Sequence, residues 1–220
     1  DVLPFLENVT RGRGIPRERL EEVGKHYFLF GGVSPINAQC RELCAALRAE
    51  LERRGPALPV YWGNRNWRPM LADTVKRMAD DGIRRAVAVA TSAYSSYSAC
   101  RQYLEDIDAA RAAVGASAPR IEKLPPFWNH PGFIETMAVH TRDALSRMET
   151  ERAKTRLVFT AHSIPTAMAA TCDYAVELHE ASALVAERVA STDAPSGRSI
   201  ITDSSDLLSN GKSFTVTSRV

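Results

Sequence analysis

The sequence lacks a long uninterrupted apolar run, and none of its apolar stretches approaches the roughly 20 residues that cross a bilayer. It also lacks the N-terminal apolar segment of a secretory signal, and it opens at Asp1 rather than at a methionine. We therefore expect a cytoplasmic protein without a transmembrane segment, from which an N-terminal piece is missing.

An excess of charge of one sign is also absent. The chain has 28 Lys and Arg residues against 26 Asp and Glu residues, a formal net charge of +2. Nucleic-acid-binding proteins usually concentrate basic residues on one face, so we expect no nucleic-acid partner. With 45% hydrophobic and 25% charged residues, the 220-residue chain has the composition of a folded globular protein.

Cysteine is sparse, and its spacing matches no zinc motif. Cys40 and Cys44 are four residues apart on an expected helix and could share a metal, but small packing residues in a reducing compartment are the more common case. We interpret them, together with Cys100 and Cys172, as packing residues. No G-x-G-x-x-G or G-x-x-x-x-G-K-[ST] motif follows an expected strand, which disfavours dinucleotide and nucleoside triphosphate binding.

Apolar strand-like runs alternate with amphipathic helical stretches, which predicts an α/β fold with a mainly parallel sheet. The predicted helices cover 17–30, 34–54, 69–81, 98–114, 133–148 and 171–190, and the predicted strands cover 58–62, 85–91, 121–124 and 156–161. The almost wholly apolar run 85–91 predicts a strand buried on both faces. From residue 191 onward Ser, Thr, Asp and Gly dominate, so we expect a disordered tail or a poorly packed hairpin.

Unusual residues follow each predicted strand, at the end where ligands bind in parallel α/β sheets. His162 comes directly after strand 156–161, where a neutral imidazole can bind a metal or accept a proton. A histidine that only caps or packs is equally compatible with this position. A serine hydrolase is disfavoured, because Ser163 and His162 are adjacent and no G-x-S-x-G motif exists.

Three other segments are candidates for binding an acidic ligand. Segment 92–98 is rich in hydroxyl groups that can donate hydrogen bonds to carboxylates, although a plain loop with a serine cap is an equal alternative. Segment 63–68 combines arginines with an indole, which could bind a large flat acid. The turn 31–35 leads into a helix N-terminus that can receive a carboxylate, but a serine that serves only as a helix cap is the more common case.

Together these segments resemble the ferrochelatase family, and in detail its actinobacterial coproporphyrin-using branch. The matching stretches, in family order, are DVLPFLENV (1–9), RGR (11–13), GGVSPIN (31–37), YWGNRNW (61–67), TSAYSSYS (91–98), FWNHPGF (127–133) and FTAHSIP (159–165). The resemblance extends over residues 1–190.

The resemblance implies a three-layer αβα chelatase fold with parallel sheets, built from two Rossmann-like domains. Residues 1–132 are then the first domain without its first strand, 133–190 the start of an incomplete second domain, and 191–220 a divergent, disordered tail. It also implies insertion of Fe(II) into coproporphyrin III, with loss of two pyrrole protons. No cofactor is required, no iron–sulfur cluster is expected in this chain, and we expect a monomer.

In the family, the histidine of the A-H-S-[IL]-P motif binds the incoming metal or takes a pyrrole proton, which implies that role for His162 as the catalytic and metal-binding residue. Both functions need a neutral imidazole, so the chemistry should weaken as pH falls. The family's second metal ligand, a glutamate, lies beyond the resembling region and is not present in this chain. We therefore expect weak or no activity. The alternative function is a catalytically impaired fragment that only binds porphyrin or haem.

The resemblance also implies the contacts with the porphyrin. Ser34 corresponds to a family serine that touches a propionate. An aromatic residue of a later loop corresponds to Trp128 or to Phe127, and the choice stays open. The candidate substrate-binding residues are Ser34, Trp128, Tyr27, His26 and Arg11.

Overall fold

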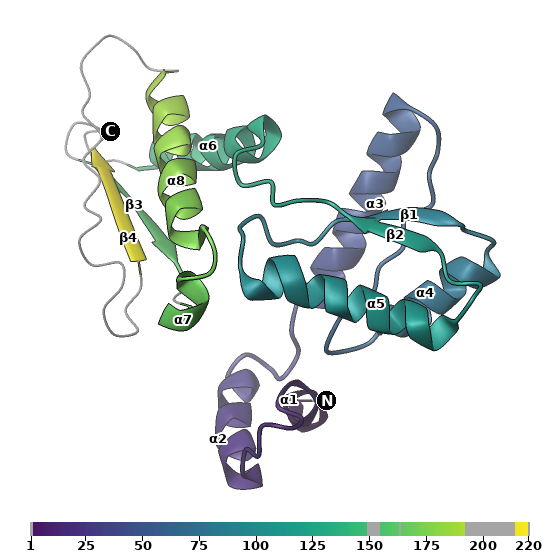
Figure 1. Ribbon diagram of the computed structural model, residues 1–220. Coiled ribbons are helices and arrows are strands. Elements are labelled where there is room, and N and C mark those ends of the chain that lie inside the picture. The colour runs from purple at the N-terminus through teal and green to yellow at the C-terminus, as the bar shows by residue number, and fades with distance from the viewer. Residues whose placement is uncertain (1, 149–154, 163, 192–213, 220) are drawn as a thin grey trace. The chain divides into compact units, whose positions relative to one another are not determined.

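The computed structural model describes residues 2–148, 155–162, 164–191 and 214–219. By its internal contacts the chain divides into two compact units. Unit 1 comprises Asp1–Ala86 and Glu105–Glu122, and unit 2 comprises Val87–Leu104 and Lys123–Val220. Each unit combines helices with short strands (Figure 1).

The secondary structure is mostly helical. In chain order the elements are α1 Val2–Val9, α2 Arg17–Phe28, α3 Ile36–Arg54, α4 Leu71–Asp80, β1 Arg85–Ala88, the π-helical η1 Tyr97–Gln102, α5 Tyr103–Val114, β2 Arg120–Lys123, α6 Pro131–Ser146, β3 Arg156–Ala161, α7 Thr166–Ala169, α8 Tyr174–Ser191 and β4 Phe214–Arg219. In the described ranges no helix is both long and apolar enough to cross a membrane.

Unit 1 has several small apolar clusters. Helices α1 and α2 pack on each other through buried Val2, Leu6 and Leu20 (Figure 1). Helix α4 buries Val75 and Met78 on its inner face. Strand β1 pairs with β2 in a two-stranded sheet. The pairing is parallel, because the amides of residues 120 and 124 donate in the same sense to the carbonyls of residues 84 and 88.

Unit 2 has the largest continuous core. Helix α6 packs along α8, and apolar residues of β3 lie against the same helix pair. The buried residues of this core are Ile134, Ala138, Leu145, Ala181, Val185 and Val189. Their spacings are four and seven residues on α6 and four residues on α8, which are the spacings of a helix face turned to a core. Strand β3 pairs antiparallel with β4, from Arg156 opposite Arg219 to Ala161 opposite Phe214.

Most predicted elements are confirmed with small shifts of their ends. Strand 156–161 is found as predicted, and 121–124 differs from β2 by one residue at each end. Helix 98–114 is found, but its first part is the π-helix η1, which begins at Tyr97 because Ser96 Oγ accepts a hydrogen bond from the amide of Ala99 at 3.0 Å. The helix α1 was not predicted.

Two predictions about strands are wrong. Segment 58–62 is not a strand, because it has no strand neighbour among the described residues. Strand 85–91 ends at Ala88, and it is not buried on both faces: Val87 and Val89 are 63% and 58% exposed. Since β1 has one partner strand in the described part, its apolar sequence does not bring burial. The expected parallel pairing is found between β1 and β2, whereas β4 joins β3 antiparallel.

The expected tail is described only in part. Residues 192–213 and 220 lie outside the described residues, whereas Phe214–Arg219 forms β4. The tail therefore contains a strand, which the alternative of a hairpin included and the alternative of a disordered tail did not. The expected domain borders at residues 132 and 190 stay a prediction.

Candidate functional site

In unit 2, His162 directly follows the last residue of β3 and is exposed. Its backbone carbonyl accepts a hydrogen bond from the hydroxyl of Tyr174 at 3.0 Å. Ser163, the next residue of the motif, lies outside the described residues. The strand therefore brings the imidazole to its carboxyl end, and a residue from the start of α8 holds the backbone there.

The hydroxyl-rich segment 92–98 lies in the same unit and is fixed by its backbone. The amide of Ser95 donates to Oε2 of Glu177 at 2.6 Å. The ring of Tyr94 makes edge-on contacts with Tyr174 and Phe133, with centroids 6.1 and 6.2 Å apart. Burial raises the pKa of Tyr94, and the nearby Tyr174 and the carboxylate of Glu177 raise it further.

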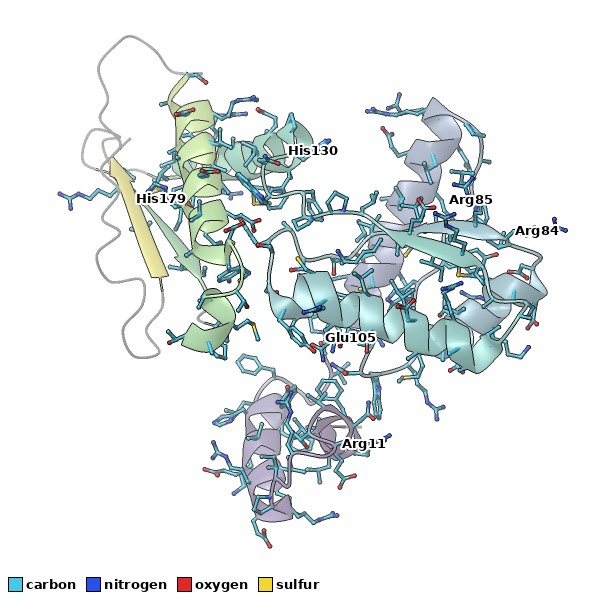
Figure 2. The ribbon with its side chains drawn as sticks, viewed as in Figure 1. Arg11, Arg84, Arg85, Glu105, His130 and His179 are labelled. Atoms are coloured by element: carbon cyan, nitrogen blue, oxygen red, sulfur yellow. The ribbon has the colours of Figure 1, made fainter. Side chains whose placement is uncertain are left out.

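The aromatic segment 127–133 borders this loop. The amide of Phe127 donates to the carbonyl of Ala93 at 3.0 Å, and the Phe127 ring meets Phe133 edge-on at 5.6 Å. Trp128 is half-buried and packs against the core of unit 2. His130 precedes α6 and caps it, because Nδ1 accepts from the amide of Gly132 at 3.1 Å (Figure 2). Segments 92–98, 127–133 and 159–162 are thus brought together.

In unit 1, an aromatic series connects the predicted substrate residue Tyr27 to the arginine–indole segment. Tyr27 contacts Phe5 edge-on at 6.3 Å, and Phe5 contacts Trp67 at 6.0 Å. The side chain of Asn8 donates to the carbonyl of Asn66 at 2.7 Å. Helix α1 therefore lies between α2, which carries Tyr27, and the arginine–indole segment 63–68, and it contacts both.

The turn between α2 and α3 carries Ser34. Gly31 and Gly32 both adopt positive φ, at 79° and 67°, a conformation that favours glycine, and the amide of Gly32 donates to the carbonyl of Tyr27 at 2.9 Å. Ser34 is exposed, and its Oγ accepts from the amide of Ile36 at 3.3 Å. Ser34 therefore bonds to the first residue of α3, but the N-cap position is Pro35, without a side-chain cap, so the expected serine N-cap is not found.

The remaining predicted residues, Arg11 and His26, are exposed to solvent. Arg11 follows α1 (Figure 2), His26 lies in the last turn of α2, and both are exposed. Shortly after His26 in sequence, a continuous run of the chain exposes large apolar side chains. These are Phe28, Leu29, Phe30, Val33 and Ile36, which are 54–85% exposed. We call this run the 28–36 apolar surface.

Another feature of unit 1 is a cavity of about 400 Å³, lined by Arg41, Cys44, Arg48, Trp62, Pro69 and Arg77. Arg65 of the arginine–indole segment is not part of this lining, and it forms an ion pair with Asp106. The guanidinium group of Arg65 is therefore already engaged within the protein.

Sequence reasoning missed Tyr174 and Glu177, which contact two of the predicted segments. Glu177 is 8% exposed and lies on the buried face of α8 with Ala181 and Val185. A carboxylate on the apolar stripe of an amphipathic helix is the signal that could have identified it.

The described residues contain no group of three or more His, Cys, Asp and Glu side chains that could hold a metal ion. All four cysteines are free and half-buried, which agrees with their interpretation as packing residues.

The helices and short strands described above define an α/β protein. The family follows from comparison with known proteins. The Ferrochelatase family model matches residues 1–199, and the chain belongs to this family. The expected αβα chelatase fold is the fold of that family.

The relatives agree with this membership. A ferrochelatase of Rhodopirellula baltica is 51% identical over 193 residues, which cover 88% of this chain and 55% of that protein. A coproporphyrin III ferrochelatase of Mycolicibacterium smegmatis is 59% identical over 172 residues, covering 78% and 51%. One from Streptomyces griseus is 54% identical over 194 residues, covering 86% and 52%. The chain thus spans about half the length of the curated relatives it matches.

Proposed function

We propose that this chain takes part in the insertion of Fe(II) into coproporphyrin III, with His162 as the residue that handles the metal and the pyrrole protons. Membership of the ferrochelatase family and the names of the actinobacterial relatives support the reaction and its substrate. The observation that carries the proposal is the exposed position of His162 directly after β3, in the motif that resembles the family's metal-handling histidine.

The chemistry needs a base and a metal ligand near the porphyrin nitrogens. Fe(II) brings two positive charges, and the porphyrin loses two protons, so charge balances without an oxidant or a reductant. A neutral imidazole has one nitrogen with a free electron pair, which can coordinate the metal or accept a proton, but not both at once. His162 therefore needs at least one further group for the complete reaction. The proposal requires no organic cofactor.

The porphyrin contacts are proposed for two sets of residues. In unit 1, exposed Ser34, Arg11 and His26 offer donors or positive charge to propionates, and Tyr27 offers a ring to the macrocycle. In unit 2, Trp128 of the segment 127–133 has the same aromatic character. The 28–36 apolar surface supports this proposal, since a flat tetrapyrrole needs an apolar surface beside its charged edge.

The second candidate is a protein that binds porphyrin or haem without inserting iron. The observation that favours it is the 28–36 apolar surface, which suits a flat ligand whether or not iron is inserted. For either function we propose a monomer in the cytoplasm. The four free cysteines support a reducing compartment.

The test begins with the complete chain and coproporphyrin III under anaerobic conditions. Quenching of porphyrin and tryptophan fluorescence measures binding, and the change of the porphyrin absorption spectrum after addition of Fe(II) measures insertion. We expect binding, and slow insertion that His162→Ala lowers by at least about tenfold. His140→Ala is the matched control, because His140 is also exposed but lies on α6 away from the predicted segments.

Each outcome decides between the candidates. Insertion that depends on His162 and not on His140 supports the ferrochelatase reaction. Binding without insertion favours the porphyrin-binding function. A chain that is folded by circular dichroism and leaves the porphyrin fluorescence unchanged contradicts both.

A further inference from the structure

The first turn of α8 contacts two of the segments that form the candidate site. Tyr174 and Glu177 are three residues apart, so they lie on the same side of the helix. Tyr174 donates its hydroxyl hydrogen to the carbonyl of His162 at 3.0 Å. Glu177 accepts the amide hydrogen of Ser95 at 2.6 Å, across 82 residues of sequence. One helical turn of α8 thus bonds to the backbone of His162 and to the backbone of segment 92–98.

The ring of Tyr94 strengthens the same connection. It lies edge-on against Tyr174, with 6.1 Å between ring centroids and 85° between ring planes. It also meets Phe133, with 6.2 Å between ring centroids. The loop is therefore held by α8 through the ring of Tyr94 and through the amide of Ser95. The hydroxyl of Ser95 is buried and makes no hydrogen bond within the described part of the chain, so it does not contribute to this attachment.

The burial of Glu177 indicates that its carboxylate contributes to the structure mainly through the hydrogen bond with the Ser95 amide. The residue is 8% exposed, and no ion pair joins it to a cation in the described ranges. A buried carboxylate without a cation is unfavourable by itself, and an apolar residue would fill the same space with less desolvation. What the carboxylate adds is a directed, charge-assisted hydrogen bond to one backbone amide.

We propose that Tyr174 and Glu177 are positioning residues that fix His162 relative to the hydroxyl-rich segment 92–98. We call the pair the α8 clamp. The inference builds on the proposed function, because it assigns to the clamp the geometry in which His162 meets a porphyrin bound beside that segment. Misplacement of a reacting group by about 1 Å can lower a rate by as much as 100-fold, so such a clamp affects catalysis without touching substrate.

The first test does not depend on activity. The five histidines of the chain are labelled with ¹³C in the ring, and the His162 signal is identified by its loss in His162→Gln. Tyr174→Phe removes only the hydroxyl and keeps the ring contact with Tyr94. We expect this variant and Glu177→Ala to shift or broaden the His162 signal, while the signals of His26 and His140 stay in place.

Glu177→Gln provides the conservative rescue. Its amide oxygen can still accept from the Ser95 amide, so the His162 signal should return toward the wild-type position. Two controls lie on the same helix: Glu180→Gln changes an exposed carboxylate, and Ser182→Ala removes a buried hydroxyl that bonds only to Leu178 within the helix. Both should leave His162 unchanged. A general loss of packing would instead disturb the controls and the other histidines as well.

The second test uses iron insertion. We expect Tyr174→Phe and Glu177→Ala to lower the insertion rate about tenfold and to change the porphyrin Kd less than about threefold, with Glu177→Gln close to wild type. Unchanged His162 signals in folded Tyr174→Phe and Glu177→Ala would overturn the clamp. If Glu177→Ala does not fold, Tyr174→Phe decides alone. A wild-type chain that binds no porphyrin contradicts the proposed function, and the signal shifts still decide whether the clamp exists.

Discussion

Helices α3 and α8 are similar in length and differ sharply in burial. Helix α3 has 19 residues, none of them buried, and its Ile36, Leu43 and Leu47 are 41–54% exposed. Helix α8 has 18 residues, of which seven are buried. Both sequences show apolar residues at helical spacing. The difference therefore comes from what packs against each helix: α8 has α6 and β3, whereas among the described residues no surface buries the apolar side of α3.

The comparison shows that the spacing of apolar residues predicts where a helix forms, but not how much that helix contributes to the stability of the fold. Isolated helices are marginal in water, and most helical stability in proteins comes from packing of the apolar face. In unit 2 that face is covered, and the same helix also carries the α8 clamp. The candidate metal-handling residue is thus attached to the best-packed part of the chain, whereas the proposed porphyrin contacts in unit 1 lie beside an open apolar surface.

The largest expected effect is a charge placed in the core of unit 2. Val189 is fully buried on α8, so Val189→Asp puts a carboxylate among apolar side chains. The desolvation of this carboxylate is expected to exceed any gain from Arg142, whose guanidinium reaches the carbonyl of Arg188, and to lower the free energy of unfolding by about 4 kcal/mol. Urea unfolding followed by circular dichroism measures it.

Leu47→Asp on α3 is the matched substitution, because the change is similar and Leu47 is 41% exposed. We expect a loss below about 0.5 kcal/mol there. Equal losses for the two variants would show that α3 is covered in solution, and the contrast between the helices would then be wrong.

Much of the fold follows from local sequence signals. The helix that begins at Arg17 follows Pro16, as the preference of proline for helix starts predicts, and α3 ends at Arg54, directly before Gly55. The strand 156–161 and the position of His162 after it were also predictable, because alternating residues of this short apolar run turn Leu157 and Phe159 to the core.

Features that depend on distant partners were not predictable. Segment 58–62 has the composition of a strand, but a strand exists only where a neighbour pairs with it. The antiparallel partner of β3 comes from a segment with few apolar residues. The roles of Tyr174 and Glu177 depend on segments 12 and 82 residues away in sequence, and no local pattern encodes those contacts.

The next effect sharpens the contrast between packed and exposed aromatic residues within unit 1. Phe5 lies between the rings of Tyr27 and Trp67, whereas Phe30 is 85% exposed. We expect Phe5→Ala to lower the free energy of unfolding by about 2 kcal/mol, and Phe30→Ala to change it by less than about 0.5 kcal/mol. Thermal melting measures both. If Phe30→Ala destabilises as much as Phe5→Ala, the 28–36 apolar surface is packed in solution.

The smallest effect compares one tyrosine of each unit at high pH. The pKa of Tyr61 is raised mainly by the hydrogen bond it donates to Asp81, and that of Tyr94 mainly by burial. A raised pKa means that the folded state favours the neutral phenol. Each contribution to stability is therefore complete below the unfolded pKa of about 10 and is lost as pH rises through the folded pKa.

We expect the absorbance at 295 nm, which reports tyrosine ionisation, to rise at higher pH in the native chain than in urea. Asp81→Asn should bring the pKa of Tyr61 back toward its ordinary range, because this shift depends on the neighbouring carboxylate of Asp81 at the surface. The pKa of Tyr94 should stay raised, because burial is its main cause. A single, undelayed titration that Tyr94→Phe does not alter would mean that this ring is not buried against α8, and the packing that distinguishes unit 2 would then be absent around the site itself.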